Sequence, residues 1–253
     1  MSTARRPLIA GNWKMHKTVT ETRAFFAGLR GFRLPLDEVD AVICPPYTAL
    51  AAARDEIAGT PIGLGAQNVG WAAQGAFTGE ISAPMLAELG VRWCVIGHSE
   101  RRALFGELDY RVNEKARIAL KYGITPIVAV GETEDEHEAG EARDTVCAQA
   151  GAAFAGIPSD DVARCVVAYE PIWAIGTGRA DTPESANAIM GEIRRAVNGL
   201  QDVRILYGGS MKPDNVAAFV AQPNIDGGLV GGASLEAASF AALLDGAREA
   251  ART

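Results

Sequence analysis

The chain alternates eight times between a short apolar run and a segment with helical spacing, and this alternation constrains its fold more than any other feature. Turn residues follow each run. Because strands joined through helices must return to the same edge of a sheet, the pattern predicts a parallel sheet. The predicted strands are Leu8–Gly11, Ala41–Cys44, Ile62–Ala66, Cys94–Ile96, Ile127–Val130, Cys165–Tyr169, Val203–Leu206 and Gly228–Val230.

Eight such units, at about 32 residues each, match the size of a closed (β/α)8 barrel. We therefore predict an α/β protein in which residues 1–253 form a single barrel domain. An open doubly wound sheet is the alternative. It would normally carry a glycine fingerprint after its first strand, and the sequence Gly-Asn-Trp-Lys-Met at 11–15 is not one. No shift in composition and no low-complexity linker divides the chain.

Two of the intervening segments carry clear helix signals. The first begins at residues 181–184, where Asp-Thr-Pro-Glu supplies a capping side chain and a proline for the first helical turn. Its predicted apolar face consists of Ile189, Ile193, Val197 and Leu200. The second segment has a predicted apolar face made of Val112, Ala116, Ala119 and Leu120.

The charge balance argues against nucleic acid as a partner. The formal net charge is −7, the sequence pI is about 5.1, and no basic tract or stripe is visible. A protein of this charge that binds an anion must use local devices, namely a placed lysine, helix N-termini and backbone N–H groups.

The apolar pattern and the cysteines indicate a cytoplasmic protein. No stretch approaches the ~18 apolar residues of a membrane span, and no signal-peptide core precedes Leu8-Ile9-Ala10. Three of the four cysteines lie inside apolar runs and none forms a Cys-x-x-Cys pair, which is typical of buried, reduced thiols. The cysteines are Cys44, Cys94, Cys147 and Cys165.

The residues that directly follow the predicted strands are unusually polar. In a barrel the carboxyl ends of all strands meet at one mouth, where the active sites of this fold lie. A lysine, a histidine and glutamates are therefore expected to converge there. The residues are Asn12 and Lys14 after the first strand, Gln67 and Asn68 after the third, His98, Ser99 and Glu100 after the fourth, Glu132 after the fifth, and Glu170 after the sixth.

Each of these residues has an ordinary structural alternative. Lys14 alone would be a solvated surface lysine, and a lone histidine such as His98 is usually a satisfied core residue. His16 and His137 have the polar or acidic neighbours typical of surface positions. No second histidine completes a His-Glu-x-x-His zinc motif after His137, and no Pro-Cys-x-x-Cys accompanies His98 as in zinc deaminases. We therefore predict no metal site.

Glycine-rich turns follow the last two strands. They are Gly208-Gly209-Ser210 and Gly231-Gly232. Tight turns use glycine in any case, but barrels commonly bind phosphate with these two loops, where glycine lets backbone N–H groups approach the oxygens. No Gly-Lys-Ser/Thr of a nucleotide-binding loop is present. A small phosphorylated substrate is the prediction.

With these residues in place, the chain resembles the triosephosphate isomerase family along essentially its whole length. The resemblance implies a TIM barrel that interconverts dihydroxyacetone phosphate and glyceraldehyde 3-phosphate in the cytoplasm, in glycolysis and gluconeogenesis, without a cofactor. The matching stretches are GNWKM (11–15), GAQNV (65–69), GAFTGEIS (75–82), VIGHSERR (95–102), VGE (130–132), YEPIWAIGTG (169–178), LYGGS (206–210) and LVGGASL (229–235).

The resemblance also implies roles for individual residues. Glu170 would be the general base, and His98, as a neutral imidazole, would polarise the carbonyl and move protons between the substrate oxygens. Lys14 would stabilise the enediolate and the phosphate, while Asn12 orients the substrate. Glu100 is a supporting residue beside the site. Besides Asn12 and Lys14, the phosphate-binding residues would be Gly176, Ser210, Gly231 and Gly232.

Two further expectations concern loops. The segment after Glu170 has the composition of a movable lid, with Pro171-Ile172-Trp173 and Gly176-Thr177-Gly178 as its hinges and Ala174-Ile175 as its apolar tip. The segment 67–80 carries Trp71 and Phe77 outside any regular period, which indicates a partner site. The resemblance adds a homodimer in which Thr78 approaches the partner's Asn12 and His98.

Three positions depart from the family pattern. Ala129, Arg179 and His16 stand where relatives often have cysteine, lysine and asparagine, and none belongs to the predicted catalytic set.

Two alternative functions are another enzyme on a phosphate-binding barrel and a non-catalytic binder. A Schiff-base aldolase would need a lysine within a strand, and none of the eight runs has one. A non-catalytic binder should have lost Lys14, His98 or Glu170, and the sequence retains all three.

Overall fold

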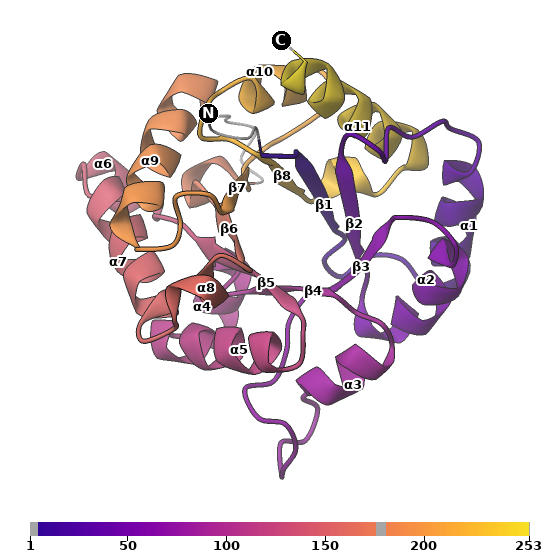
Figure 1. Cartoon of the computed structure of the whole chain (residues 1–253), viewed down its shortest axis with the longest axis horizontal. Helices are drawn as coiled ribbons and strands as arrows, with labels where there is room; N and C mark the ends of the chain where they lie inside the picture. The colour runs from indigo at the N-terminus through magenta and orange to yellow at the C-terminus, as the bar shows by residue number, and fades with distance from the viewer. Residues whose placement is uncertain (1–4, 176–180, 253) are drawn as a thin grey trace.

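The eight apolar runs pair side by side into a closed parallel barrel, with the helices around it (Figure 1). The computed structural model describes residues 5–175 and 181–252. Each strand overlaps its predicted range, so the predicted (β/α)8 barrel is confirmed. The strands are β1 Leu8–Asn12, β2 Asp40–Cys44, β3 Gly63–Ala66, β4 Trp93–Ile96, β5 Thr125–Val130, β6 Val166–Tyr169, β7 Arg204–Tyr207 and β8 Gly227–Val230.

The ring closes where the first strand meets the last. Leu8 to Gly11 of β1 pair in parallel with residues 227–230 of β8, and β1 also pairs with β2 on its other side. Each strand therefore has a neighbour on both edges, and all carboxyl ends lie at the same mouth.

Helices surround the barrel between successive strands. Among the described residues they are α1 Val19–Leu29, α2 Leu50–Ile57, α3 Ala83–Glu88, α4 Ser99–Phe105, α5 Asp109–Lys121, α6 Glu134–Glu138, α7 Ala142–Phe154, α8 Ser159–Val162, α9 Pro183–Ala196, α10 Val216–Val220 and α11 Ala237–Ala251. Three short 3-10 helices accompany them, η1 Tyr47–Ala49, η2 Ile172–Ala174 and η3 Gly232–Ser234. In the described part of the chain, no helix is both long and apolar enough to cross a membrane.

Both faces of the strands are buried, as their continuous apolar runs predict. One set of side chains fills the barrel interior, and the alternate set packs against the helices. The interior set consists of Leu8, Ala10, Val42, Cys44, Val95, Ile127, Ala129, Val166, Ala168, Leu206 and Leu229. Three cysteines are buried as expected, whereas Cys147 is only partly covered, and all four are unpaired.

The predicted helix signals hold with one correction. The face of α5 is buried as predicted, and α9 begins where expected, with the Thr182 hydroxyl accepting from the Ser185 N–H at 3.2 Å. However, α9 ends at Ala196, so the prediction that its face extends to Val197 and Leu200 is wrong. Val197 is extended, and Gly199 at φ 98° turns the chain toward β7.

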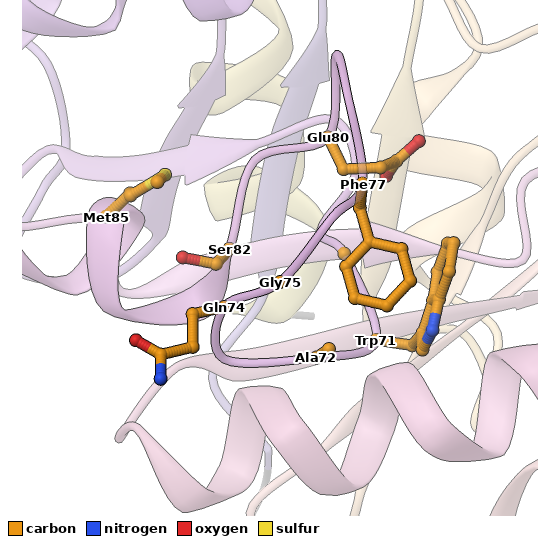
Figure 2. Close-up of a pocket in the computed structure, with 9 residues that line it drawn as sticks. Trp71, Ala72, Gln74, Gly75, Phe77, Glu80, Ser82 and Met85 are labelled. Atoms are coloured by element: carbon orange, nitrogen blue, oxygen red, sulfur yellow. The ribbon is translucent and has the colours of Figure 1, made fainter.

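The segment 67–80 between β3 and α3 projects from the barrel (Figure 1). Figure 2 shows its two aromatic side chains, Trp71 and Phe77, next to each other. Their rings pack edge to face, with centroids 4.9 Å apart. The guanidinium of Arg111 lies 4.0 Å from the Trp71 ring centroid. Phe77 is 40% exposed and Thr78 is exposed, whereas Trp71 is half-buried. Phe77 is therefore the exposed aromatic that the sequence predicts, and its ring packs against the half-buried Trp71 ring.

Candidate active site

Lys14 lies just beyond β1 in a constrained backbone conformation. Its φ of 52° falls in the left-handed region, which costs a non-glycine residue on the order of 1–3 kcal/mol. Its N–H donates to Asn12 Oδ1 at 3.1 Å, and its carbonyl accepts from Gln67 Nε2 at 2.8 Å. Its Nζ lies 2.7 Å from Glu100 Oε1. Lys14 is therefore a positioned cation rather than a free surface lysine.

His98 is buried at the start of α4, and its bonding defines its protonation. Nδ1 accepts from the N–H of Glu100 at 3.2 Å, so the proton of the ring lies on Nε2 and the ring is neutral. Nε2 lies 3.0 Å from Glu170 Oε1. Burial disfavours a charged ring, but the Glu170 carboxylate outweighs burial and raises the pKa of His98. That contribution depends on direct contact and is lost if a ligand separates the two groups.

Glu170 directly follows β6, and its side chain is 2% exposed. Its Oε2 accepts from the Ser99 N–H at 2.8 Å. Burial opposes ionisation, but His98 and then Ser99 outweigh it and lower the pKa of Glu170. Two glycines leave room for this residue. A Cβ at Gly131 would lie 1.9 Å from the Glu170 carbonyl oxygen, and one at Gly208 would lie 2.8 Å from its Cγ.

The four predicted catalytic residues and the two glycine-rich turns line one cavity of about 310 Å³ at the mouth of the barrel. Ile175 also lines this cavity. A Cβ at Gly208 would lie 2.8 Å from Glu170 Cγ and one at Gly231 would lie 3.5 Å from Lys14 Cε, whereas a Cβ at Gly232 would meet no atom within 4 Å. The lining includes Asn12, Lys14, His98, Glu170, Ser210, Gly231 and Gly232. Glu100 lies in an adjoining cavity and reaches the site through Lys14.

The predicted lid is only partly within the described residues. Pro171–Ile175 are described, whereas Gly176, Thr177, Gly178 and Arg179 lie outside the described residues. No cluster of metal-ligating side chains occurs in the parts of the chain described, 5–175 and 181–252.

Comparison with known proteins decides the family. The sequence profile of the family "Triosephosphate isomerase" matches residues 7–247. The chain is 53% identical over 242 residues to the triosephosphate isomerase of Chloroflexus aurantiacus, covering 93% of this chain and 97% of the relative. It is 50% identical over 252 residues to that of Symbiobacterium thermophilum, covering 97% and 98%. The chain belongs to the triosephosphate isomerase family.

A second buried carboxylate near the mouth was given no role by sequence reasoning. Glu132 lies two residues after β5, and it is fully buried. Its Oε1 accepts from Trp173 Nε1 at 2.7 Å and from the Tyr169 hydroxyl at 3.0 Å. Burial raises the pKa of Glu132. The sequence did contain a sign that Glu132 has a specific role, because a glutamate that closely follows a buried apolar run is unusual.

Trp173, in the first predicted hinge of the lid, is only 8% exposed. His137 was expected at the surface, and its side chain is 38% exposed. Its ring stacks on the Trp173 ring, with centroids 4.3 Å apart, so each side chain covers part of the other.

A buried ion pair behind β4 was also missed. Lys115 Nζ lies 2.5 Å from Glu107 Oε2 and 2.8 Å from Asn68 Oδ1. Glu107 Oε1 accepts from the N–H of Gly97 at 2.9 Å, directly before His98. The pair therefore supports the backbone that carries the histidine. The sequence contained one sign of this pair, because Lys115 lies on the apolar face of α5, one helical turn after Val112.

Proposed function

We propose that this family member is an isomerase that interconverts dihydroxyacetone phosphate and D-glyceraldehyde 3-phosphate through an enediolate. The proposal rests mainly on the contact between the buried Glu170 carboxylate and the neutral His98 imidazole, which line a cavity with Lys14 and two glycine-rich turns. A base, a hydrogen-bond donor and a cation around a small anion-sized space suit proton transfer next to a carbonyl. The reaction belongs to glycolysis and gluconeogenesis.

In this mechanism Glu170 removes the carbon-bound proton. In the structure the carboxylate contacts His98 Nε2, so a substrate that accepts a hydrogen bond from Nε2 has to separate the two groups. Because His98 contributes most to lowering the pKa of Glu170, separation leaves the effect of burial, which raises that pKa. Substrate binding thus makes the carboxylate a stronger base when it is needed.

His98 and Lys14 act on the developing oxyanion. The Nε2–H of His98 donates to the carbonyl oxygen and then passes protons between the two substrate oxygens. A neutral ring suits this role, and the N–H of Glu100 at Nδ1 keeps the second nitrogen unprotonated. Lys14 supplies the compensating charge, and Glu100 restrains its Nζ. Asn12 orients the substrate from the end of β1.

The phosphate is held by backbone groups of the two glycine-rich turns. We assign Ser210, Gly231 and Gly232 to this role, because both turns line the cavity and glycine allows close approach. Gly176 is proposed to join them from the lid. The lid comprises Pro171, Ile172, Trp173, Ala174, Ile175, Gly176, Thr177 and Gly178, and by covering the bound substrate it excludes water and prevents loss of the enediolate.

A homodimer is also proposed, formed through the loop 67–80. A second cavity of about 230 Å³ opens beside Asn12 and His98, and the exposed side chains of Met15 and Phe105 line it. These residues are 95% and 68% exposed, so a partner surface would cover an apolar patch. The loop of a second copy, with Thr78 exposed on it, is the proposed occupant. We propose a cytoplasmic protein with no cofactor, metal, nucleic-acid or membrane partner.

A coupled assay of triose phosphate turnover tests the function. The parent chain should convert both substrates, and Glu170→Gln should lose about three decades of turnover or more, since the base is removed at nearly constant shape. Binding of 2-phosphoglycolate to the same variant should persist. Turnover of Glu170→Gln within tenfold of the parent would contradict the assignment. An aldolase or a non-catalytic binder would show no isomerisation in the parent.

A further inference from the structure

A glycine stands directly before the histidine of the proposed mechanism. Gly97 has φ 69°, in the left-handed region, and it connects β4 to His98. A Cβ there would lie 3.0 Å from the Ala129 carbonyl oxygen and 3.0 Å from a methyl carbon of Val112, so a larger residue would be both strained and crowded. Glycine also leaves its backbone more conformational freedom than other residues have. The orientation of His98 therefore depends on contacts that restrain the Gly97–His98 peptide.

Two charged side chains bind the polar backbone groups of Gly97. Its N–H donates to Glu107 Oε1 at 2.9 Å, and its carbonyl accepts from Arg102 Nε at 2.7 Å. Glu107 is itself fixed by contacts with Lys115 and Arg101. Both backbone groups therefore bind ionised side chains, which form stronger hydrogen bonds than neutral ones.

Arg102 connects several parts of the mouth through one guanidinium. Besides binding Gly97 just after β4, it donates from Nη2 to the Ala129 carbonyl of β5 at 3.3 Å. Its Nη1 lies 2.5 Å from Asp109 Oδ1, at the start of α5. The side chain is only 16% exposed. Because a guanidinium presents its donors in a fixed planar geometry, Arg102 holds the ends of β4 and β5 in place relative to α4 and α5.

The restrained peptide determines where the imidazole lies through short local contacts. The His98 carbonyl accepts from the backbone N–H of Arg102 at 3.1 Å, in the first turn of α4. The same turn supplies the Glu100 N–H that donates to Nδ1 of the ring at 3.2 Å. A rotation of the Gly97–His98 peptide would therefore move the ring and disturb the 3.0 Å contact between Nε2 and Glu170 Oε1.

We propose that Arg102 is a positioning residue for the isomerisation, which holds the Gly97–His98 peptide so that the imidazole faces the substrate. Arg102 is not among the described residues that line the cavity, so it acts through the peptide and not on the substrate. Misplacing a reacting group by about 1 Å can lower turnover about 100-fold, so loss of the guanidinium should lower kcat by about ten- to 100-fold. The KM should change little, because the phosphate is bound elsewhere. This inference rests on the proposed function.

The direct test observes the histidines without substrate. Three are present, His16, His98 and His137, so labelling with ¹⁵N-histidine gives a small set of imidazole signals. The variant His98→Gln assigns the relevant ones. In the parent, the His98 signals should show a single neutral form with its proton on Nε2, as the bond from the Glu100 N–H requires. In Arg102→Met, which keeps a long side chain but has no donors, these signals should shift or broaden while those of the other two histidines stay.

Three further variants separate the geometry of the guanidinium from its charge. Arg102→Lys keeps a cation but loses the fork that reaches both carbonyls, so its kcat and histidine signals should resemble those of Arg102→Met. Asp109→Asn removes the ion pair and leaves both carbonyl bonds, so it should stay close to the parent. Arg164→Met is the matched control, because Arg164 also pairs with an aspartate and donates to a carbonyl, at 2.9 and 3.5 Å, but it lies before β6, away from the mouth. It should leave kcat and the His98 signals unchanged.

Stability has to be measured beside activity. Circular dichroism confirms that each variant is folded, and unfolding in urea gives its stability. A purely structural role for Arg102 would lower stability without changing kcat or the His98 signals. Arg102→Lys, which retains the charge beside Asp109, provides the test if Arg102→Met does not fold.

The outcomes distinguish this inference from the proposed function. Unchanged His98 signals in the folded Arg102 variants, or the same change in Arg164→Met, would overturn the inference whatever the activity. In an active parent, a kcat of Arg102→Lys within about threefold of the parent would also overturn it, since no transition-state interaction would then have been lost. A parent chain whose His98 signals respond to Arg102→Met as expected, but which has no isomerase activity, would overturn the proposed function alone.

Discussion

Adding one methyl group to Gly208 should move the proposed base. This residue follows β7, and its N–H donates to the Tyr169 carbonyl at 2.7 Å. A Cβ there would lie 2.8 Å from Glu170 Cγ and 3.0 Å from the Tyr169 oxygen. Carbon atoms in contact prefer about 3.5 Å or more, so one of the groups must shift by roughly 0.7 Å. The Tyr169 carbonyl is held in the barrel, whereas the Glu170 side chain borders the open cavity and can move.

The expected cost follows from that displacement. Misplacing a reacting group by about 1 Å can lower turnover about 100-fold, whereas overpacking of this size costs roughly 1–3 kcal/mol of stability. Gly208→Ala should therefore fold and bind 2-phosphoglycolate within a few-fold of the parent, but its kcat should fall about 100-fold. Steady-state kinetics of triose phosphate turnover and a binding titration provide the two measurements.

A matched control distinguishes crowding from glycine substitution in general. Gly151 lies inside α7, and a Cβ there would meet no atom within 4 Å. Gly151→Ala should leave kcat unchanged and add up to about 1 kcal/mol of stability, the difference in helix propensity. If folded Gly208→Ala turned over within threefold of the parent, the proposed dependence of catalysis on the position of Glu170 would be refuted.

Four further predictions concern charge and assembly. Lys14→Met should weaken both turnover and phosphate-analogue binding, because it removes the placed cation; unchanged affinity for 2-phosphoglycolate in a calorimetric titration would contradict this role. Lys115→Met should lower the free energy of unfolding in urea by about 3–5 kcal/mol, with part of the loss recovered when Glu107→Gln is added; a loss below about 1 kcal/mol would show that the buried pair is unimportant. Burial raises the pKa of Glu107, but Lys115 and the other partners outweigh burial and lower it below its usual value. The difference in unfolding free energy between the parent and Glu107→Gln should therefore be complete above about pH 4.5 and shrink as pH falls through the lowered pKa. Phe77→Glu should place a charge in the proposed dimer contact and give monomers by light scattering at micromolar concentration, whereas an active parent monomer would refute the dimer.

The strands and the mouth could be predicted because their signals are local. An apolar run buried on both faces appears directly in the sequence, and the residue after it must lie at the carboxyl end of the barrel. Position at the mouth thus followed from order along the chain. The error at Val197 was also local, since Gly199, the turn that ends α9, stands two residues later.

The partners within the site could not be predicted in the same way. Lys115 is on an apolar helix face, which indicates burial, but nothing near it in the sequence identifies Glu107 and Asn68 together as its contacts. The stacking of His137 on Trp173 likewise joins positions on different elements. Such pairs depend on how the helices pack against the barrel, and the residues next to each member in the sequence do not show that packing.

The pairing of β1 with β8 has a consequence for how activity is acquired during folding. Asn12 ends the first strand, Gly231 follows the last, and both line the cavity, so its lining is complete only after the two ends of the chain have met. This contact closes the longest loop in the molecule, and long-range strand pairing is intrinsically slow. Partly folded chains that contain most of the helices should therefore be inactive. Recovery of turnover after dilution from urea should lag behind recovery of the helical signal and report the closure of the ring.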